Sequence, residues 1–123
     1  MPDATILIVE DNPQLQDLLI RYFEMEGYHI VSTNFETLDA VRGSIQNHKP
    51  RLLILDGNIH PVPSIDILSA VRNDPGLADL PVVVISGIDN PEAWLAAGAN
   101  RFILKPFMPH DLVSAVNQQL AAI

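Results

Sequence analysis

The sequence contains no cysteine, has only two lysines and has no long apolar segment. The absence of cysteine excludes disulfides, thiolate catalysis and cysteine-based metal sites. The formal net charge of −8 gives an acidic surface that repels phosphate backbones, so we expect no direct binding of nucleic acid. No apolar run approaches the ~18 residues that a membrane span needs, and residues 1–3 lack the basic start of a signal peptide. A cytoplasmic protein is therefore expected.

The chain has the length and apolar content of one globular domain. Its 123 residues are 48% hydrophobic, so we predict a single domain over 1–123 with its own core. Four apolar runs are nearly continuous and rich in branched side chains, as is typical of strands buried on both faces of a parallel sheet. These runs cover residues 5–9, 52–55, 82–85 and 102–104. A weaker alternating run over 28–33 predicts an edge strand.

Amphipathic stretches separate these runs and predict five helices. Asn12 is a good N-cap with Pro13 at the first helical position, and Gly27 ends that helix. Apolar residues at helical spacing mark the helices in turn: Leu15, Leu18, Leu19, Tyr22 and Phe23; Leu38, Val41 and Ile45; Ile65, Leu68 and Val71; Trp94 and Leu95; and Leu112, Val116 and Leu120. The alternation of strands and helices predicts an α/β fold of five βα units, with right-handed crossovers and a doubly wound sheet.

Polar side chains follow the predicted strands at the point where each one ends. The first run ends in Glu10 and Asp11, and the third strand ends in Asp56. The fourth ends in Ser86, followed by glycine, and the fifth ends in Lys105, followed by proline. The carboxyl ends of parallel strands lie at one edge of the sheet, where open α/β sheets bind their ligands. We therefore expect three carboxylates, a hydroxyl and an ammonium to converge there.

This set of groups has the parts that phosphoryl transfer requires. Clustered carboxylates repel one another unless a cation joins them, and hard oxygen ligands favour Mg²⁺ or a similar ion. A metal ion and Lys105 would neutralise the charge on the phosphoryl oxygens, and Ser86 would hydrogen-bond one of them. Gly87 would let its backbone N–H approach closely. Asp56 is the expected nucleophile, because it lies on a central strand and a carboxylate can form an acyl phosphate.

Each of these features alone has a plain structural explanation. Acidic residues such as Glu10 and Asp11 favour helix N-termini, and Asp56 with Gly57 could form an ordinary turn. Serine and glycine commonly end strands, and a lysine at a strand end is usually solvated. Four such features in order, each at a strand end, are much less expected by coincidence, which favours the functional interpretation.

The residues resemble the receiver domains of two-component response regulators. The resemblance runs from Ile6 to the last helix and is carried by segments 6–12, 52–56, 82–87 and 98–107, which match the family's acidic-pair, phosphoacceptor, hydroxyl and lysine strands. It implies a single-domain (βα)5 fold with a five-stranded parallel sheet in the flavodoxin-like order 2-1-3-4-5. It also implies a phosphoprotein that takes its phosphoryl group from a sensor histidine kinase or a phosphotransfer protein.

The resemblance assigns a role to each residue at the strand ends. It implies that Asp56 accepts the phosphoryl group, and that Ser86, Gly87 and Lys105 bind it. Asp11 and Asp56 would ligate Mg²⁺ directly, Glu10 largely through water, and Asn58 through its backbone carbonyl. The Lys105–Pro106 bond is expected to be cis. Phe102 occupies the place of the family's aromatic switch residue and would follow Ser86 inward, which changes the face formed by the fourth helix, fifth strand and fifth helix.

The resemblance also implies how such a domain signals. The switched face would contact a downstream effector protein or a fused output domain, or form a weak homodimer. The domain would catalyse its own phosphorylation and slow autodephosphorylation without turning over an external substrate.

The sequence departs from the family in two places. The loop 57–64 carries His60 where the family usually has proline, and Pro63 and Ser64 where it usually has an acidic-glycine pair. A lone loop histidine such as His60 is most often solvated. The stretch from Ser86 to Gly98 is about three residues short, so the fourth helix, interrupted early by Pro91, should lose about one turn. Trp94 on that helix is expected to pack in the core; an exposed tryptophan there would instead indicate a docking surface.

Two other interpretations remain alongside the phosphorylated receiver. The first is a pseudo-receiver, a protein-docking module with this fold that signals without phosphorylation. The second is a small α/β enzyme or cofactor carrier. The acidic loop after the first strand disfavours a flavin site. Asn58, two residues after Asp56, stands where a haloacid-dehalogenase-type phosphatase carries aspartate and a cobalamin carrier carries histidine.

Overall fold

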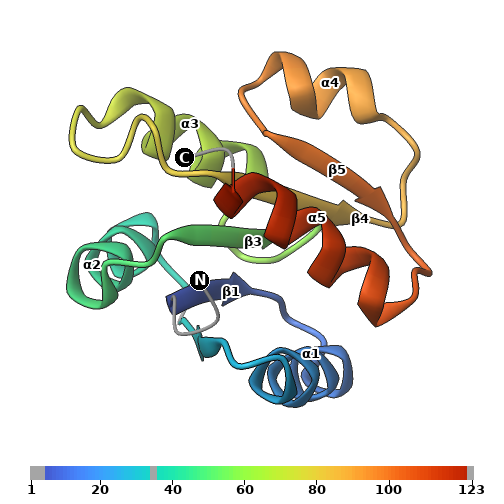
Figure 1. Cartoon of the computed structure of the whole chain (residues 1–123). Coiled ribbons are helices and arrows are strands. Elements are labelled where there is room, and N and C mark those ends of the chain that lie inside the picture. The colour runs from blue at the N-terminus through green and yellow to red at the C-terminus, as the bar shows by residue number, and fades with distance from the viewer. Residues whose placement is uncertain (1–4, 34–35, 122–123) are drawn as a thin grey trace.

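The computed structural model describes residues 5–33 and 36–121, so the predicted absence of a signal peptide at residues 1–3 lies outside it. Strands and helices alternate along the chain (Figure 1). Their order is β1 (Thr5–Val9), α1 (Pro13–Met25), β2 (His29–Ser32), α2 (Leu38–His48), β3 (Leu52–Asp56), α3 (Ser64–Asn73), β4 (Val82–Ser86), α4 (Pro91–Ala96), β5 (Arg101–Leu104) and α5 (Pro109–Ala121). None of the helices in these residues is long and apolar enough to cross a membrane.

The five strands form one parallel sheet in the order β2-β1-β3-β4-β5, which confirms the predicted fold. β2 lies at one edge, as its alternating pattern predicted, and β5 lies at the other. The register aligns Val9 with Leu55, Asp56 with Ile85, and Ser86 with Leu104. The carboxyl ends of β1, β3, β4 and β5 therefore lie side by side at one edge of the sheet.

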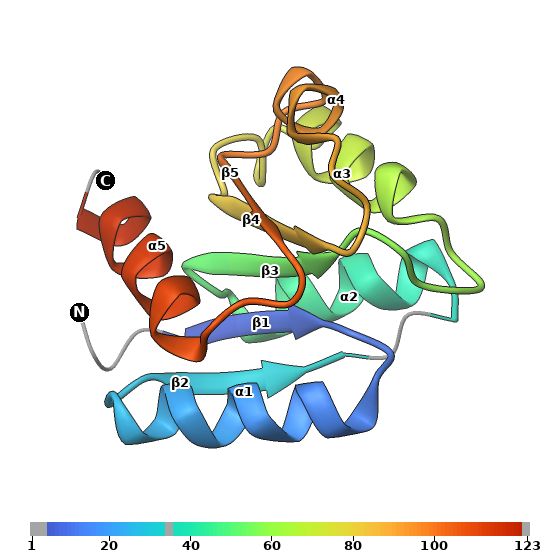
Figure 2. The ribbon, with the colours of Figure 1, turned by 90° about the vertical axis from the view of Figure 1, so that its right-hand side faces the viewer.

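Helices cover both faces of the sheet, so the core has two parts (Figure 2). On one face, β-strand side chains pack against Leu19 and Phe23 of α1 and Leu112 and Val116 of α5. On the other face, they pack against α2 and α3 and against Trp94 of α4. β1 and β3 are buried on both faces, which explains why their sequences are continuously apolar rather than alternating.

Two residues predicted to face the core are exposed instead. Leu18 of α1 and Ile65 of α3 have 49% and 45% of their surface exposed. Each lies about 100° around the helix from a buried neighbour, Leu19 in α1 and Ser64 in α3. The apolar residues of each helix thus cover a wider face than the part that contacts the sheet. The prediction that Leu18 and Ile65 face the core was wrong.

The helix α4 is short, as predicted, but Pro91 begins it rather than interrupting it. Its six residues bury a single side chain, Trp94, of which 8% is exposed. The prediction that Trp94 packs in the core is thus confirmed.

Arg72, at the end of α3, fixes the chain where it enters β5. Its Nε donates to the carbonyl of Gly98 at 2.8 Å, and its Nη2 donates to Oδ1 of Asn100 at 2.9 Å. Nη1 donates to the carbonyl of Leu80 at 2.7 Å, ahead of β4. Gly98 has a φ of 112°, and an added Cβ atom would lie 3.0 Å from Cγ of Arg72. Only glycine meets both the backbone and the space requirement at this point.

Candidate functional site

A hollow of about 380 Å³ opens at the carboxyl edge of the sheet. It lies where β1, β3 and β5 end, and residues from four separate segments line it. These residues are Glu10, Asp11, Asn12, Asp56, Asn58, His60, Gly87 and Lys105. The structure therefore brings together six of the eight residues predicted for the site, namely Glu10, Asp11, Asp56, Asn58, Gly87 and Lys105.

Glu10 directly follows β1 and is buried, with 2% of its surface exposed. Its Oε2 accepts a hydrogen bond from the backbone N–H of Asn12 at 3.0 Å. Its Oε1 lies 3.1 Å from Nζ of Lys105. The side chain of Gln16, one turn into α1, donates to the carbonyl of Glu10 at 3.3 Å. Both ends of the residue are thus fixed before any ligand binds.

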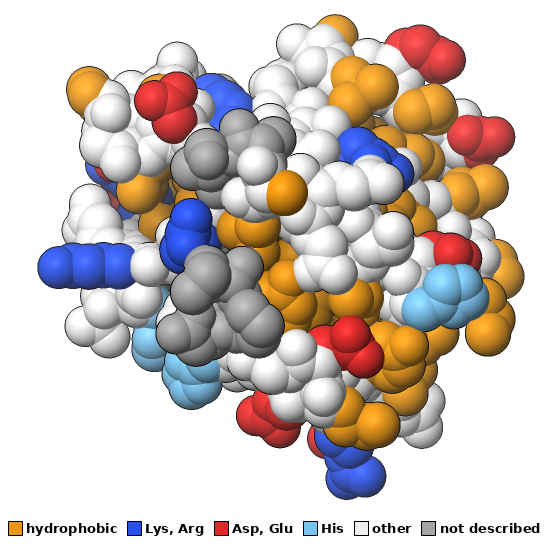
Figure 3. Space-filling model, viewed as in Figure 1, with side chains coloured by type: hydrophobic (Ala, Val, Ile, Leu, Met, Phe, Trp, Pro, Cys, Tyr) orange, Lys and Arg blue, Asp and Glu red, His pale blue; other side chains and the backbone are white. Residues whose placement is uncertain are grey.

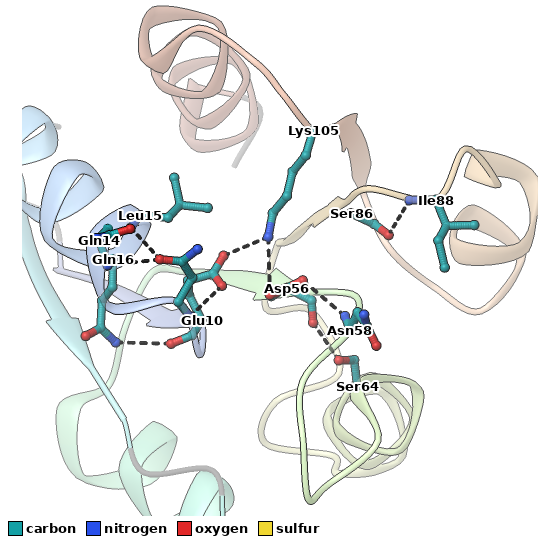
Figure 4. A network of polar contacts seen from close by, with 11 residues as sticks. Glu10, Gln14, Leu15, Gln16, Asp56, Asn58, Ser64, Ser86, Ile88 and Lys105 are labelled. Carbon is teal, nitrogen blue, oxygen red and sulfur yellow. Dashed lines mark hydrogen bonds and ion pairs between the residues drawn. The ribbon is translucent and has the colours of Figure 1, made fainter.

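Asp56 ends β3 and is equally buried, with 3% of its surface exposed. Its Oδ1 accepts a hydrogen bond from the backbone N–H of Asn58 at 3.1 Å, and its Oδ2 lies 3.3 Å from Nζ of Lys105. Ser64, at the start of α3, donates its hydroxyl to the backbone carbonyl of Asp56 at 2.5 Å. Figure 4 shows Lys105 extending between Glu10 and Asp56, with Ser64 on the far side of Asp56.

Lys105 comes from the opposite side of the site, just after β5. Its backbone N–H donates to the carbonyl of Ser86 at 2.7 Å, which continues the β4–β5 ladder to the site. The Lys105–Pro106 bond is cis, as the resemblance implied, and the His60–Pro61 bond is also cis.

The buried charges shift the pKa values of the groups that hold them. Burial, together with the nearby Asp56 carboxylate, raises the pKa of Glu10 from 4.5 to about 7. Burial alone would lower the pKa of Lys105, but the hydrogen bonds and charges of Glu10 and Asp56 outweigh it and raise that pKa above its ordinary value. A single ammonium thus faces two buried carboxyl groups, which would be better balanced by a second cation.

Three carboxylates in the hollow have the geometry of a cation site. Oxygen atoms of Glu10, Asp11 and Asp56 all lie within 4.8 Å of one another, and Asp11 is exposed to solvent. Within 5–33 and 36–121, this is the group of acidic, histidine or cysteine side chains that meets this spacing. Its donors are all hard oxygens, which suit Mg²⁺. The residues present therefore fit the expected ion.

Two predicted site residues, Ser86 and Phe102, are not among the residues that line the hollow. Ser86 is buried, with 2% exposed, and its Oγ accepts a hydrogen bond from the backbone N–H of Ile88 at 3.1 Å (Figure 4). Phe102 is half-buried on β5 and packs against the core cluster under α2 and α3. Gly87 does line the hollow, but an added Cβ atom there would meet nothing within 4 Å, so packing does not require glycine.

Four residues of the site were not predicted to be part of it. Ser64 and Gln16 hold the backbone carbonyls of Asp56 and Glu10, and Asn12 and His60 line the hollow. Ser64 and Gln16 each lie near the start of a helix that follows a strand of the site. Their place near a helix start is the feature of the sequence that could have indicated this role. His60 is exposed, which agrees with the expected solvated loop residue, and it also lines the hollow.

The fold and the site together define a doubly wound α/β domain with an ionic centre at the carboxyl edge of its sheet. The family model of the response regulator receiver domain matches residues 6–117. The chain belongs to this family, as the resemblance in its strand-end residues indicated.

Several relatives illustrate the family. The chain is 28% identical over 123 residues to the phosphate regulon transcriptional regulatory protein PhoB of Pseudomonas aeruginosa, covering 98% of this chain and 53% of that protein. It is 32% identical to the transcriptional regulatory protein CssR of Bacillus subtilis, covering 97% and 52%. The crystal structure of the receiver domain of NtrX from Brucella abortus superposes with a TM-score of 0.85 at 28% identity, covering 96% of this chain and 99% of that one. The chain thus spans about half the length of these curated relatives.

Proposed function

We propose that this chain is a phospho-accepting receiver in a two-component phosphorelay, and that residues 1–123 act as one such domain. Asp56 would take a phosphoryl group from a phosphohistidine of a sensor histidine kinase or phosphotransfer protein. The observation that supports this most directly is the position of Asp56, buried at the end of a central strand with the ammonium of Lys105 3.3 Å from its Oδ2. Asp56 also lines the hollow, together with Asp11, Asn58 and Gly87.

Glu10, Asp11 and Asp56 would hold Mg²⁺, with the backbone carbonyl of Asn58 as a further ligand. When bound, Mg²⁺ would neutralise charge on the phosphoryl oxygens and on the carboxylates around them. Lys105 supplies only one positive charge to the two buried carboxylates, and the ion would supply further positive charge.

The chain's own residues would supply the remaining steps. A carboxylate oxygen of Asp56 forms the new bond to phosphorus while the phosphorus–nitrogen bond of the donor histidine breaks, and the imidazole leaves with its electron pair. Lys105 keeps its proton and pairs with a phosphoryl oxygen. Ser86 rotates away from the N–H of Ile88 and donates its hydroxyl to another oxygen, beside the N–H of Gly87. The acyl phosphate would then be hydrolysed slowly on the protein, and we expect no steady turnover of an external phosphate ester.

The output would pass through the face formed by α4, β5 and α5, with Phe102 following Ser86 inward. Exposed hydrophobic side chains gather on this side of the molecule (Figure 3). The large ones on or beside these elements are Ile88, Leu95, Leu104 and Met108. An effector protein, a fused output domain or a second copy of the chain would cover this face. The net charge of −8 argues against direct contact with nucleic acid, and we propose a cytoplasmic location.

Intact-mass measurement tests the proposal. The protein is incubated with acetyl phosphate and Mg²⁺, and one phosphoryl group per chain is the expected gain. Asp56→Asn should retain the fold by circular dichroism and lose the adduct entirely, and chelation of the metal should have the same effect. Labelling that persists in Asp56→Asn would overturn the assignment of the acceptor.

One observation favours a second candidate, the pseudo-receiver. Lys105 already pairs with both Glu10 and Asp56, and the raised pKa of Glu10 lets that carboxyl carry a proton near neutral pH. The centre is thus partly neutralised without an ion, as a docking module would need. A wild-type protein that gains neither mass with acetyl phosphate nor a Mg²⁺-dependent change in tryptophan fluorescence would favour this candidate.

A further inference from the structure

Trp94 is the single tryptophan of the chain and the only buried side chain of α4. The flanking positions Ala93 and Leu95 are exposed, so this one indole attaches the helix to the rest of the protein. The backbone carbonyl of Trp94 also accepts hydrogen bonds from the N–H groups of Ala97 and Ala99, at 3.1 and 3.0 Å, in the turn that leads to β5. A displacement of Trp94 would therefore displace α4 and the entry to β5 with it.

The indole reaches the residue that directly follows the phosphoacceptor. A Cβ atom added to Gly57 would lie 3.1 Å from Cζ2 of Trp94, and 3.1 and 3.3 Å from Cβ and Oγ of Ser86. Both side chains thus lie against the same side of the Gly57 backbone, and a methyl group there would be in tighter than ordinary van der Waals contact with each of them.

The backbone of Gly57 does not itself require glycine. Among the described residues, the glycines with positive φ are Gly27 and Gly98, and Gly57 is not one of them. Space rather than conformation accounts for the glycine at position 57. The indole of Trp94 on α4 therefore lies beside both the end of β3 and Ser86.

We propose that Trp94 is a positioning residue that couples Ser86 and the end of β3 to α4. This inference rests on the proposed phosphorylation of Asp56. In the resting protein the indole and Ser86 share the space over Gly57, and Ser86 holds its bond to the N–H of Ile88. When Ser86 moves toward a phosphoryl group it vacates part of that space. Because protein interiors are close-packed, the indole follows, and α4 moves with its only anchor.

Trp94 provides a route separate from the one through Phe102. Phe102 pairs with Val84, two residues before Ser86 on β4, and belongs to the strand β5. Trp94 instead contacts the segment after β3 and belongs to a helix. Movement of Ser86 would therefore shift β5 through Phe102 and α4 through Trp94.

Hydrogen exchange of the amides in 91–97, with and without beryllofluoride and Mg²⁺, tests the coupling, and intact mass with acetyl phosphate is measured in parallel. Wild-type protein should form the adduct and change its exchange rates in α4. Trp94→Ala should still form the adduct, but its change in α4 should shrink by about fivefold or more. Trp94→Phe should restore most of the change, and Glu92→Gln, which is exposed on the same helix, should match wild type.

Gly57→Ala tests the same contact from the other side and keeps the indole. Its methyl group should displace Trp94 or Ser86, shift the tryptophan emission of the resting protein, and reduce the response of α4 by about fivefold. Gly57→Ala decides the question if Trp94→Ala loses its circular dichroism signal.

A wild-type response of α4 in folded Trp94→Ala would overturn the coupling while leaving phosphorylation in place. If Trp94→Ala does not fold, a wild-type response of α4 in Gly57→Ala would overturn it instead. If wild-type protein formed no adduct at all, both proposals would fall, and the fault would lie with the proposed function.

Discussion

The framework around the ionic centre has two halves, β1 with β3 and β5 with α4, which differ in how firmly side chains hold them. β1 and β3 are buried almost throughout, and α1, a 13-residue helix, covers them from one side. β5 is half-buried at residues 101–103 and exposed at Leu104, and α4 is six residues long with one buried side chain. Glu10 and Asp56 come from the first half, whereas Lys105 comes from the second. The ionic centre therefore joins a rigid region to one with room to move.

Truncation of side chains gives the largest contrast between the halves. Leu53→Ala, in the fully buried β3, should cost about 3 kcal/mol of unfolding free energy, because it leaves a cavity that the surroundings cannot fill. Leu95→Ala, on the exposed side of α4, should change it by less than about 0.5 kcal/mol. Urea unfolding followed by circular dichroism measures both. Equal costs for the two variants would contradict the contrast.

The firm half should also carry a pH dependence of stability that comes from Glu10. Its folded pKa of about 7 lies above the ordinary 4.5, so the folded state binds the proton more tightly than the unfolded state. This contribution is complete below pH 4.5 and is lost as pH rises to about 7. The wild-type protein should therefore lose on the order of 2 kcal/mol of unfolding free energy across that window, and Glu10→Gln should not show this loss.

The comparison of Glu10→Gln with wild type is made without metal, in the presence of a chelator, by urea unfolding at several pH values. Carboxylates remote from the site affect both proteins alike and cancel in the difference, which therefore reports Glu10 together with its interaction with Asp56. A difference in stability that stays constant from pH 4.5 to 7 would show that Glu10 titrates normally.

The link between the halves should give a smaller effect, on the rate of phosphorylation. Lys105→Ala removes a charged hydrogen bond of about 1.5 kcal/mol or more, so adduct formation should slow by about tenfold. The response of α4 to beryllofluoride should weaken as well. Lys49→Ala removes the other lysine, exposed after α2 and remote from the hollow, and should leave both unchanged. An unaltered rate of adduct formation in Lys105→Ala would show that Lys105 does not assist phosphoryl transfer.

Most of the fold was predictable because the strands are buried on both faces. The runs 52–55 and 82–85 match β3 and β4 to within one residue, since no solvent-facing position interrupts them. Helices were predicted in place, but not which apolar residues contact the sheet, as Leu18 and Ile65 show. Periodicity gives the direction of a helix face, whereas the width of the contact depends on neighbouring elements.

The site was predictable where it follows directly from strand ends. Glu10, Asp56 and Lys105 meet because parallel strands place their last residues at one edge. The position of Trp94 against Gly57 was not predictable, because it depends on the path of two loops and on the tilt of a short helix. The same holds for Ser64, whose hydroxyl reaches back across eight residues to the carbonyl of Asp56.

The clamp that Arg72 forms with Gly98 and Asn100 has a consequence for how this surface can evolve. It fixes the point where the chain re-enters the sheet, while the ladder from Lys105 to Ser86 fixes the other end of β5. The stretch between β4 and β5 therefore connects two stationary points. Insertions and deletions within it would lengthen or shorten α4 without shifting the alignment of β5, so partner recognition can diversify while the ionic centre is inherited intact.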